Sequence, residues 1–298
     1  MRYGFYCVLA LSGAAMLAAT ARADTVIYNN LTPNNLMAIA TRPESTGKFE
    51  IEAGDDFVVA GGEARVNSAS FTGLIVPGSG APTISDVVVE IYRVFPADSD
   101  VGRTSGPPTF STPQVPTRVN SPSDVAFATR DSASGLTFTT SQLSASFTAL
   151  NSVTPGGIHP MPNQTTMGNG QLTGQEVQFN VTFTTPFDLP ADHYFFVPQV
   201  EVDDGGNFYW LSADRPITGA NGTTPFPMGV TDLQAWTRDA MLDPDWLRVG
   251  TDIVDGAAPV PTFNTAFELF GTVPEPSTVV LTVTGVLALI GIRRRSVL

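Results

Sequence analysis

The sequence predicts an all-β protein: a single antiparallel β-sandwich of jelly-roll-like form, flanked by an N-terminal signal helix and a C-terminal transmembrane helix. Three observations predict it. Apolar and polar residues alternate through the middle of the 298-residue chain, which is the period of a strand with one wet face. Such runs recur at intervals of about 10 residues, with Gly, Pro, Asn and Ser between them. Long uncharged runs occur near the two ends.

The composition excludes several classes of protein. Hydrophobic residues make up 42% of the chain and charged residues 14%, which is the reverse of a disordered protein. The single cysteine cannot build a disulfide scaffold. A formal net charge of −13 repels phosphate, so we expect no nucleic-acid partner.

Residues 1–23 are predicted to be a secretory signal peptide. A basic second residue is followed by an uncharged stretch, residues 5–19, rich in Ala and Leu. Ala21 and Ala23 then form the A-x-A pattern that fits the pocket of signal peptidase, with cleavage expected before Asp24. The alternative is a buried N-terminal helix of the fold.

The body of the protein, residues 24–272, carries 10 basic and 27 acidic residues. Its clearest strand signal is the alternation over residues 176–183, and residues 263–269 alternate in the same way. Further strands are expected at residues 69–76, 86–95, 125–129, 136–140, 143–147, 194–202 and 208–213. No internal repeat or change of composition marks a domain boundary, so we expect one domain.

Other segments of the body have different signals. Residues 49–59 are expected to form a hairpin that turns at residues 53–56, Ala-Gly-Asp-Asp. A short helix is expected at residues 231–241. Stretches rich in Pro or Gly predict loops at residues 102–124, 155–174 and 255–261.

The C-terminal end has three consecutive features. Residues 273–277 read Val-Pro-Glu-Pro-Ser, an uncharged run extends from residue 277 to 292, and three arginines follow at 293–295. The run of 16 residues would be about 24 Å long as a helix, against a hydrocarbon core of about 30 Å, so it is short but sufficient for a span. The arginines are expected to stay on the cytoplasmic side.

These three features together resemble the PEP-CTERM sorting signal, also named the ice-binding protein C-terminal motif. The resemblance covers residues 273–298 alone. In that family an exosortase, a membrane-bound cysteine transpeptidase of Gram-negative bacteria, recognises the Pro-Glu-Pro element and cuts near it. The resemblance implies two sets of functional residues: Pro274, Glu275 and Pro276 for recognition, and Arg293, Arg294 and Arg295 for stopping transfer.

The resemblance also implies a route for the protein. It would be exported, held in the inner membrane transiently through residues 277–292, and then released to the cell surface or the extracellular matrix of a biofilm. Exopolysaccharide is the matrix partner that the resemblance implies. The alternative is a permanent single-pass anchor with an incidental proline pair.

The body offers few groups for catalysis. His159 lies in a loop rich in Gly and Pro, His193 is expected at a turn, and no G-x-S-x-G motif occurs, so we predict no catalytic triad. The segment that contains Glu201 and Asp203 resembles the E-x-D-x-x-E signature of a jelly-roll glycosidase family. Gly206 stands at the third position, however, where the acid/base carboxylate would be needed.

No metal site and no cofactor are predicted. Zinc sites need clusters of His and Cys, which the chain lacks. Calcium takes oxygen ligands from loops, but the aspartate clusters do not have EF-hand spacing, and residues 203–207 are interpreted as a hairpin turn. Glu50 and Glu52 are expected on the solvent side of a strand. The clusters considered are Asp98 with Asp100, Asp203 with Asp204, and Asp243 with Asp245.

Aromatic residues suggest one candidate ligand site. Tyr209 and Trp246, with Asp203, would form a sugar-binding platform if their rings were exposed beside carboxylates, whereas core packing is the alternative fate of such rings. The function expected from the whole sequence is a non-enzymatic surface or matrix protein. A carbohydrate-binding, lectin-like sandwich is the second hypothesis, and a divergent jelly-roll glycosidase is the third.

Overall fold

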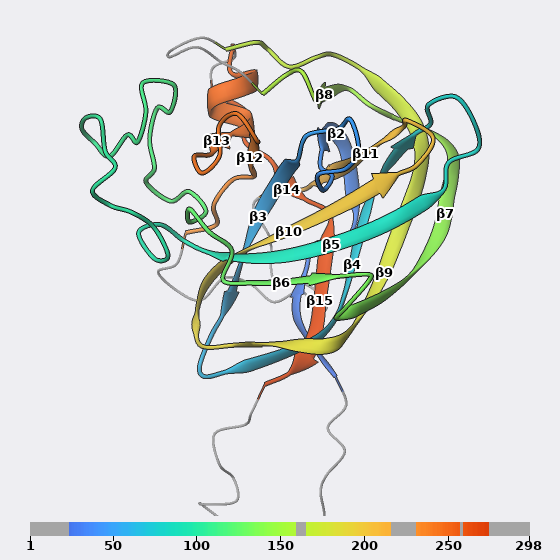
Figure 1. The fold of residues 1–298 in the computed structure, drawn as a ribbon, viewed down its shortest axis with the longest axis horizontal. Coiled ribbons are helices and arrows are strands. Elements are labelled where there is room, and N and C mark those ends of the chain that lie inside the picture. Colours follow the sequence, from blue (N-terminus) through green and yellow to red (C-terminus); the bar gives the residue numbers. More distant parts are fainter. Residues whose placement is uncertain (1–23, 159–164, 216–230, 257–258, 274–298) are drawn as a thin grey trace, which may run out of the picture.

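A computed structural model describes residues 24–158, 165–215, 231–256 and 259–273 of the protein. These residues form two β-sheets, which confirms the all-β class and the sandwich (Figure 1). The nine-stranded sheet contains β1 (Thr25–Asn29), β2 (Pro33–Ala40), β4 (Ala64–Val76), β7 (Leu136–Ala149), β8 (Asn151–Val153), β9 (Leu172–Leu189), β11 (Asn207–Ala213), β14 (Asn264–Thr265) and β15 (Phe267–Thr272). The six-stranded sheet contains β3 (Ile51–Val59), β5 (Ile84–Arg93), β6 (Ala128–Asp131), β10 (Asp192–Val202), β12 (Trp236–Asp239) and β13 (Leu247–Arg248).

Strand β4 organises the larger sheet. It pairs antiparallel with β9 along one edge, and with β15 and then β11 along the other edge. Strand β7 extends the sheet beyond β9, while β1 extends it beyond β15. In the smaller sheet the order is β13-β12-β3-β10-β5-β6. A π-helical turn, η1 (Val249–Val254), follows β13.

The main hydrophobic core lies between the two sheets. The predicted alternation in β9 is confirmed, because Val177, Phe179 and Val181 are all buried. Aromatic rings join the layers: Phe196 of β10 stacks on Phe267 of β15 with ring centroids 5.0 Å apart. Such stacked rings bury large apolar areas and fix the spacing of the layers.

A second, smaller hydrophobic cluster covers the outer face of the six-stranded sheet. Because side chains alternate along β10, Phe196 faces the main core while Phe195 and Val197 face outward. Val94 and Ala126 of the long connection between β5 and β6 pack against this cluster, and Leu233 and Trp246 come from the segments on either side of β12. The outer cluster consists of Tyr92, Phe195, Val197, Leu233, Trp236 and Trp246.

The hairpin predicted at residues 49–59 is wrong. The segment forms one continuous strand, β3, that pairs with β10 on one side and with β12 on the other. Gly54 gives no turn but allows close packing, since a Cβ atom there would lie 3.0 Å from the Val197 side chain. Asp55 and Asp56 are fully buried instead of exposed in a turn.

The helix predicted at residues 231–241 is also wrong. Residues 236–239 form strand β12, which pairs with both β3 and β13. Trp236 and Thr237 are both buried, on opposite faces of this strand. Because neither face is exposed to solvent, the sequence shows no alternation of apolar and polar residues that would predict a strand.

Several boundaries differ from the prediction. The strand expected at residues 125–129 is β6, which begins at Ala128, and the two runs expected at 136–140 and 143–147 form the single strand β7. Residues 203–207 are a turn between two strands, as expected, but those strands belong to different sheets, so the turn is not a hairpin. The loop predicted at residues 102–124 is confirmed as part of the connection between β5 and β6.

Candidate functional site

The predicted processing residues lie almost entirely outside the described part of the chain. Ala21, Ala23, the Pro-Glu-Pro element at 274–276, the segment 277–292 and the arginines at 293–295 are not described. Asp24 is described, and it is exposed and accepts a hydrogen bond from Asn67 Nδ2 at 2.7 Å. None of the helical structure in the described ranges has the length and hydrophobicity that a membrane span requires.

The residues predicted for a sugar-binding platform are not brought together. Tyr209 belongs to the main core, whereas Trp246 belongs to the outer cluster and donates a hydrogen bond from Nε1 to the Ser123 carbonyl at 3.1 Å. Their rings are 5% and 2% exposed. Asp203 lies exposed in the turn after β10. An exposed aromatic face is what a sugar platform needs, so these three residues do not form one.

The candidate catalytic carboxylates also have structural partners. Glu201 forms an ion pair with Lys48, the two side-chain atoms being 2.7 Å apart. Glu52 is 2% exposed, so its placement on the solvent side was wrong. His159 lies outside the described residues, and His193 is part of β10, where Nε2 lies 2.5 Å from Asp56 Oδ2.

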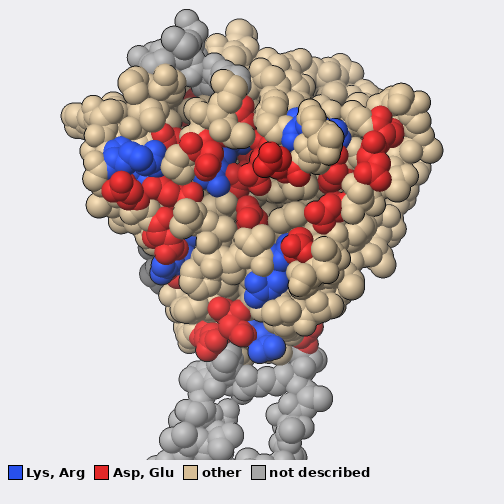
Figure 2. All heavy atoms as spheres, in the orientation of Figure 1, with Lys and Arg blue, Asp and Glu red and all other residues tan. Residues whose placement is uncertain are grey.

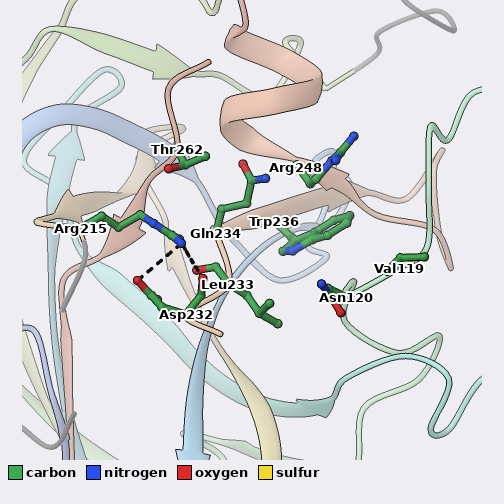
Figure 3. A pocket seen from close by; sticks show the side chains of 9 residues that line it. All are labelled: Val119, Asn120, Arg215, Asp232, Leu233, Gln234, Trp236, Arg248 and Thr262. Atoms are coloured by element: carbon green, nitrogen blue, oxygen red, sulfur yellow. Dashed lines mark hydrogen bonds and ion pairs between the residues drawn. The ribbon is translucent and has the colours of Figure 1, made fainter. Parts of the chain in front are cut away.

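A pocket of about 180 Å³ opens where the connection before β6 meets the segment before β12 (Figure 3). Its volume matches that of about six liquid water molecules, so it could hold a small polar ligand. Indole, amide, hydroxyl and guanidinium groups line it. The lining residues are Val119, Asn120, Arg215, Asp232, Leu233, Gln234, Trp236, Arg248 and Thr262.

The two arginines of the pocket are each held by a carboxylate. Arg248 makes two parallel hydrogen bonds to Asp252, with distances of 2.9 and 2.6 Å. Arg215 lies 3.5 Å from an Asp232 carboxylate oxygen and also donates to Asn264 Oδ1 at 2.6 Å (Figure 3). Bidentate pairing fixes the guanidinium plane. The charges on the pocket wall are therefore balanced before any ligand enters.

Two buried aspartates lie behind the pocket on β3. Asp55 Oδ2 accepts hydrogen bonds from the backbone N and the Oγ1 of Thr265, at 2.7 and 3.1 Å. Asp56 Oδ2 accepts a hydrogen bond from the backbone N of Leu233 at 3.1 Å. The other oxygen of each aspartate has no hydrogen-bond partner among the described residues.

Burial sets the protonation of this group. Burial and the neighbouring Asp56 raise the pKa of Asp55 well above its usual range. Burial raises the pKa of Asp56 as well, although the hydrogen bond from Leu233 lowers it. Burial lowers the pKa of His193 to about 4, so its imidazole is neutral at neutral pH. These groups are neutralised within the fold, which is the arrangement expected of structural polar groups in a core.

Sequence reasoning missed the pocket because its residues come from segments far apart in the chain. Residues 119–120, 215, 232–236, 248 and 262 share no motif and no spacing. The buried aspartates had a local signal, the Asp-Asp pair inside an apolar run, but this signal is also typical of a turn.

Comparisons with known proteins give no relative for this chain: no family model matches it, and no curated protein and no solved structure matches it significantly.

Proposed function

We propose that the protein is exported, sorted by an exosortase-type transpeptidase, and works as a non-enzymatic β-sandwich protein of the cell surface or extracellular matrix. The observation that supports this proposal is the position of the fold boundaries. Strand β1 begins at Thr25, one residue after the expected signal cleavage before Asp24, and β15 ends at Thr272, with Val273 between it and the Pro-Glu-Pro element. Cleavage at both positions would leave every described strand intact.

The arrangement of the strands supports reading the body as one jelly-roll-like domain. Strand β1 from the beginning of the body pairs with β15 from its end. Strand β3 likewise pairs with β12, although the two are far apart in the sequence. Both sheets contribute to one main core. A single domain with adjacent ends is well suited to release by two cuts, because neither cut breaks a core contact.

The sorting proposal is tested by replacing Pro274, Glu275 and Pro276 with alanine in the native cell. We expect a full-length, membrane-bound form to accumulate, because the transpeptidase loses its recognition element while the apolar segment still inserts. The size and fractionation of the protein are measured by immunoblot. The matched control is Pro259→Ala together with Glu63→Gln, two exposed positions of the body. Processing that is unchanged in the triple variant would contradict the proposal.

Saccharide binding is the second candidate function, and the pocket of Figure 3 favours it. Neutral polar groups from Asn120, Gln234 and Thr262 surround a space that suits a single sugar ring, beside the edge of Trp236. The indole N–H of Trp236 has no hydrogen-bond partner within the described part of the chain. A divergent glycosidase is not favoured by any described contact.

The saccharide hypothesis is tested with the full-length protein in mild detergent on a glycan array, with and without calcium. We expect binding of a neutral glycan that Asn120→Leu or Gln234→Leu weakens at least about tenfold, since each removes a side-chain hydrogen bond to an uncharged ligand and leaves its polar group unpaired. Asp203→Asn, in the exposed turn, is the control. An array without any bound glycan would remove this hypothesis and leave the sorting proposal standing.

A further inference from the structure

Three glutamates meet on the outer face of the six-stranded sheet. Glu52 lies on β3, Glu50 precedes the same strand by one residue, and Glu90 lies on β5. One carboxylate oxygen of each lies within 4.8 Å of the other two. Residues two apart on a strand share a face, so Glu50 and Glu52 both point outward, and the long side chain of Glu90 reaches toward them. Figure 2 shows many acidic side chains on the face in view, with basic side chains among them.

The charges around these three glutamates are mainly negative. Arg238 of β12 donates a hydrogen bond from Nε to Glu52 Oε2, and its guanidinium lies 4.4 Å from the centre of the Trp246 ring. Arg238 Nη1 also lies 2.9 Å from Asp243 Oδ1, so one positive charge faces the three glutamates and a fourth carboxylate. At such short separations, like charges repel strongly unless a proton or a cation lies between them.

The hydroxyl group of Tyr92 lies within hydrogen-bond distance of two carboxylates but has a single hydrogen to donate. Its hydroxyl oxygen lies 2.7 Å from Glu52 Oε1 and 3.0 Å from Glu90 Oε2, and it accepts a hydrogen bond from Arg238 Nη2 at 2.8 Å. A hydroxyl group has one hydrogen to donate. One of its two carboxylate contacts thus lacks a hydrogen while both carboxylates are ionised.

A fully buried amide completes the cluster. Gln199 of β10 is 0% exposed and donates from Nε2 to Glu50 Oε1 at 3.1 Å. Its Oε1 has no hydrogen-bond partner among the residues that the structure describes. Buried amide oxygens are nearly always paired, so this one calls for an explanation. The unpaired atom is an oxygen of the kind that hard cations bind.

We propose that Glu50, Glu52 and Glu90 bind a divalent cation, with Ca²⁺ the best chemical match and Gln199 Oε1 as a neutral fourth ligand. Carboxylate and amide oxygens are the ligands that Ca²⁺ prefers, and water completes its shell of six to eight oxygens. The two positive charges of the ion would offset part of the excess negative charge around the cluster. The ion would also replace the hydrogen bond that Glu50 loses when the Gln199 amide turns its oxygen toward the metal.

A proton is the competing occupant of this site. Burial and the neighbouring Glu52 raise the pKa of Glu90 to about 8. Binding is therefore measured above that pH, where the competition is weak. The full-length protein in mild detergent is stripped with a chelator and titrated with CaCl₂ by calorimetry. We expect one saturable site with a Kd of about 10⁻⁴–10⁻³ M, the range of extracellular calcium modules.

Conservative variants assign the ion to this cluster. Glu50→Gln and Glu90→Gln each remove one charged ligand at constant size, so each should weaken Ca²⁺ binding at least about tenfold. Glu63→Gln, in the exposed turn between β3 and β4, is the matched control and should bind as the wild type does. Thermal unfolding of each variant in EDTA shows that it folds.

Three results would overturn the proposal. One is the absence of saturable binding with Ca²⁺, Mg²⁺ or Mn²⁺. Another is wild-type binding by both folded variants, which would place the ion elsewhere. The third is a stability that changes with pH but not with metal, which would identify the occupant as a proton only. None of these results bears on exosortase sorting, because the site lies within the body.

Discussion

The most unusual residues of this protein are the carboxylates that the fold buries. Asp56 is 1% exposed, its Oδ2 lies 2.5 Å from His193 Nε2, and its pKa is raised. The folded state therefore binds a proton there more tightly than the unfolded chain, whose aspartates titrate near 3.9. Between these two pKa values the free energy of unfolding falls as pH rises, by at most about 1.4 kcal/mol per pH unit.

Asp56→Asn should remove this penalty. An amide oxygen in the place of Oδ2 can accept hydrogen bonds from Leu233 N and from the Nε2–H of a neutral His193, without carrying a charge. We expect the variant to be more stable than the wild type at about pH 8. Below about pH 4 the two proteins should be equally stable, because the protonated Asp56 of the wild type is then as neutral as the asparagine of the variant. Urea unfolding at the two pH values measures the difference. Asp203→Asn, at an exposed site, should change neither value, and a loss of stability at pH 8 in Asp56→Asn would contradict the argument.

Residue-scale chemistry also explains which site predictions failed. The sequence allows the rings of Tyr209 and Trp246 to be either a ligand platform or part of the core, and their burial places them in the core. A ring at a strand position looks the same in sequence whether a loop covers it or not. Trp246 is covered because residues 94–127 return across the sheet, a contact between parts of the chain 123 residues apart.

At the scale of the element, strands with one wet face were predictable and strands with two covered faces were not. Strand β9 alternates because Gln178 and Asn180 lie on the side away from the core. Strand β3 is covered by the second sheet on one face and by the outer cluster on the other, so its pattern has no alternation.

The same reasoning accounts for the false hairpin and the false helix. Gly54, Asp55 and Asp56 are turn formers by local preference, but Thr265 and Leu233, which donate hydrogen bonds to the two aspartates, lie 210 and 177 residues away from them. Tertiary hydrogen bonds of this range overrode the local signal. Within residues 231–241, Trp236–Asp239 likewise form a strand because they pair with the edge of β3.

The cluster of Glu50, Glu52 and Glu90 shows that predicting single strands does not predict which strands become neighbours. Glu50 and Glu52 were recognised as sharing a face, but solvent was assigned to that face. Strands β5 and β12 bring Glu90 and Arg238 beside them, and no sequence pattern gives the order of strands in a sheet. A single chain can show which residues point together along one strand, but not which strands become neighbours.

For the whole molecule, the described chain ends lie side by side. Thr25 of β1 pairs with Gly271 of β15, and Thr25 Oγ1 donates to the Gly271 carbonyl at 3.1 Å. Figure 1 shows both strands at the same end of the sandwich. The body between the two described ends therefore closes on itself. Any processing that removed β1 would uncover β15 and part of the core.

The closure of the fold by β1 leads to a prediction for two truncated proteins, residues 24–273 and residues 30–273. We expect 24–273 to unfold in one cooperative step. We expect 30–273 to lose at least about 3 kcal/mol of unfolding free energy or not to fold, because it lacks Ile27 and the Tyr28 ring, which stacks on Phe267 at 4.2 Å. Urea unfolding followed by fluorescence measures both. Equal stability of the two proteins would show that the fold does not need β1. The start of β1 beside the expected signal cleavage site would then no longer support the proposed processing.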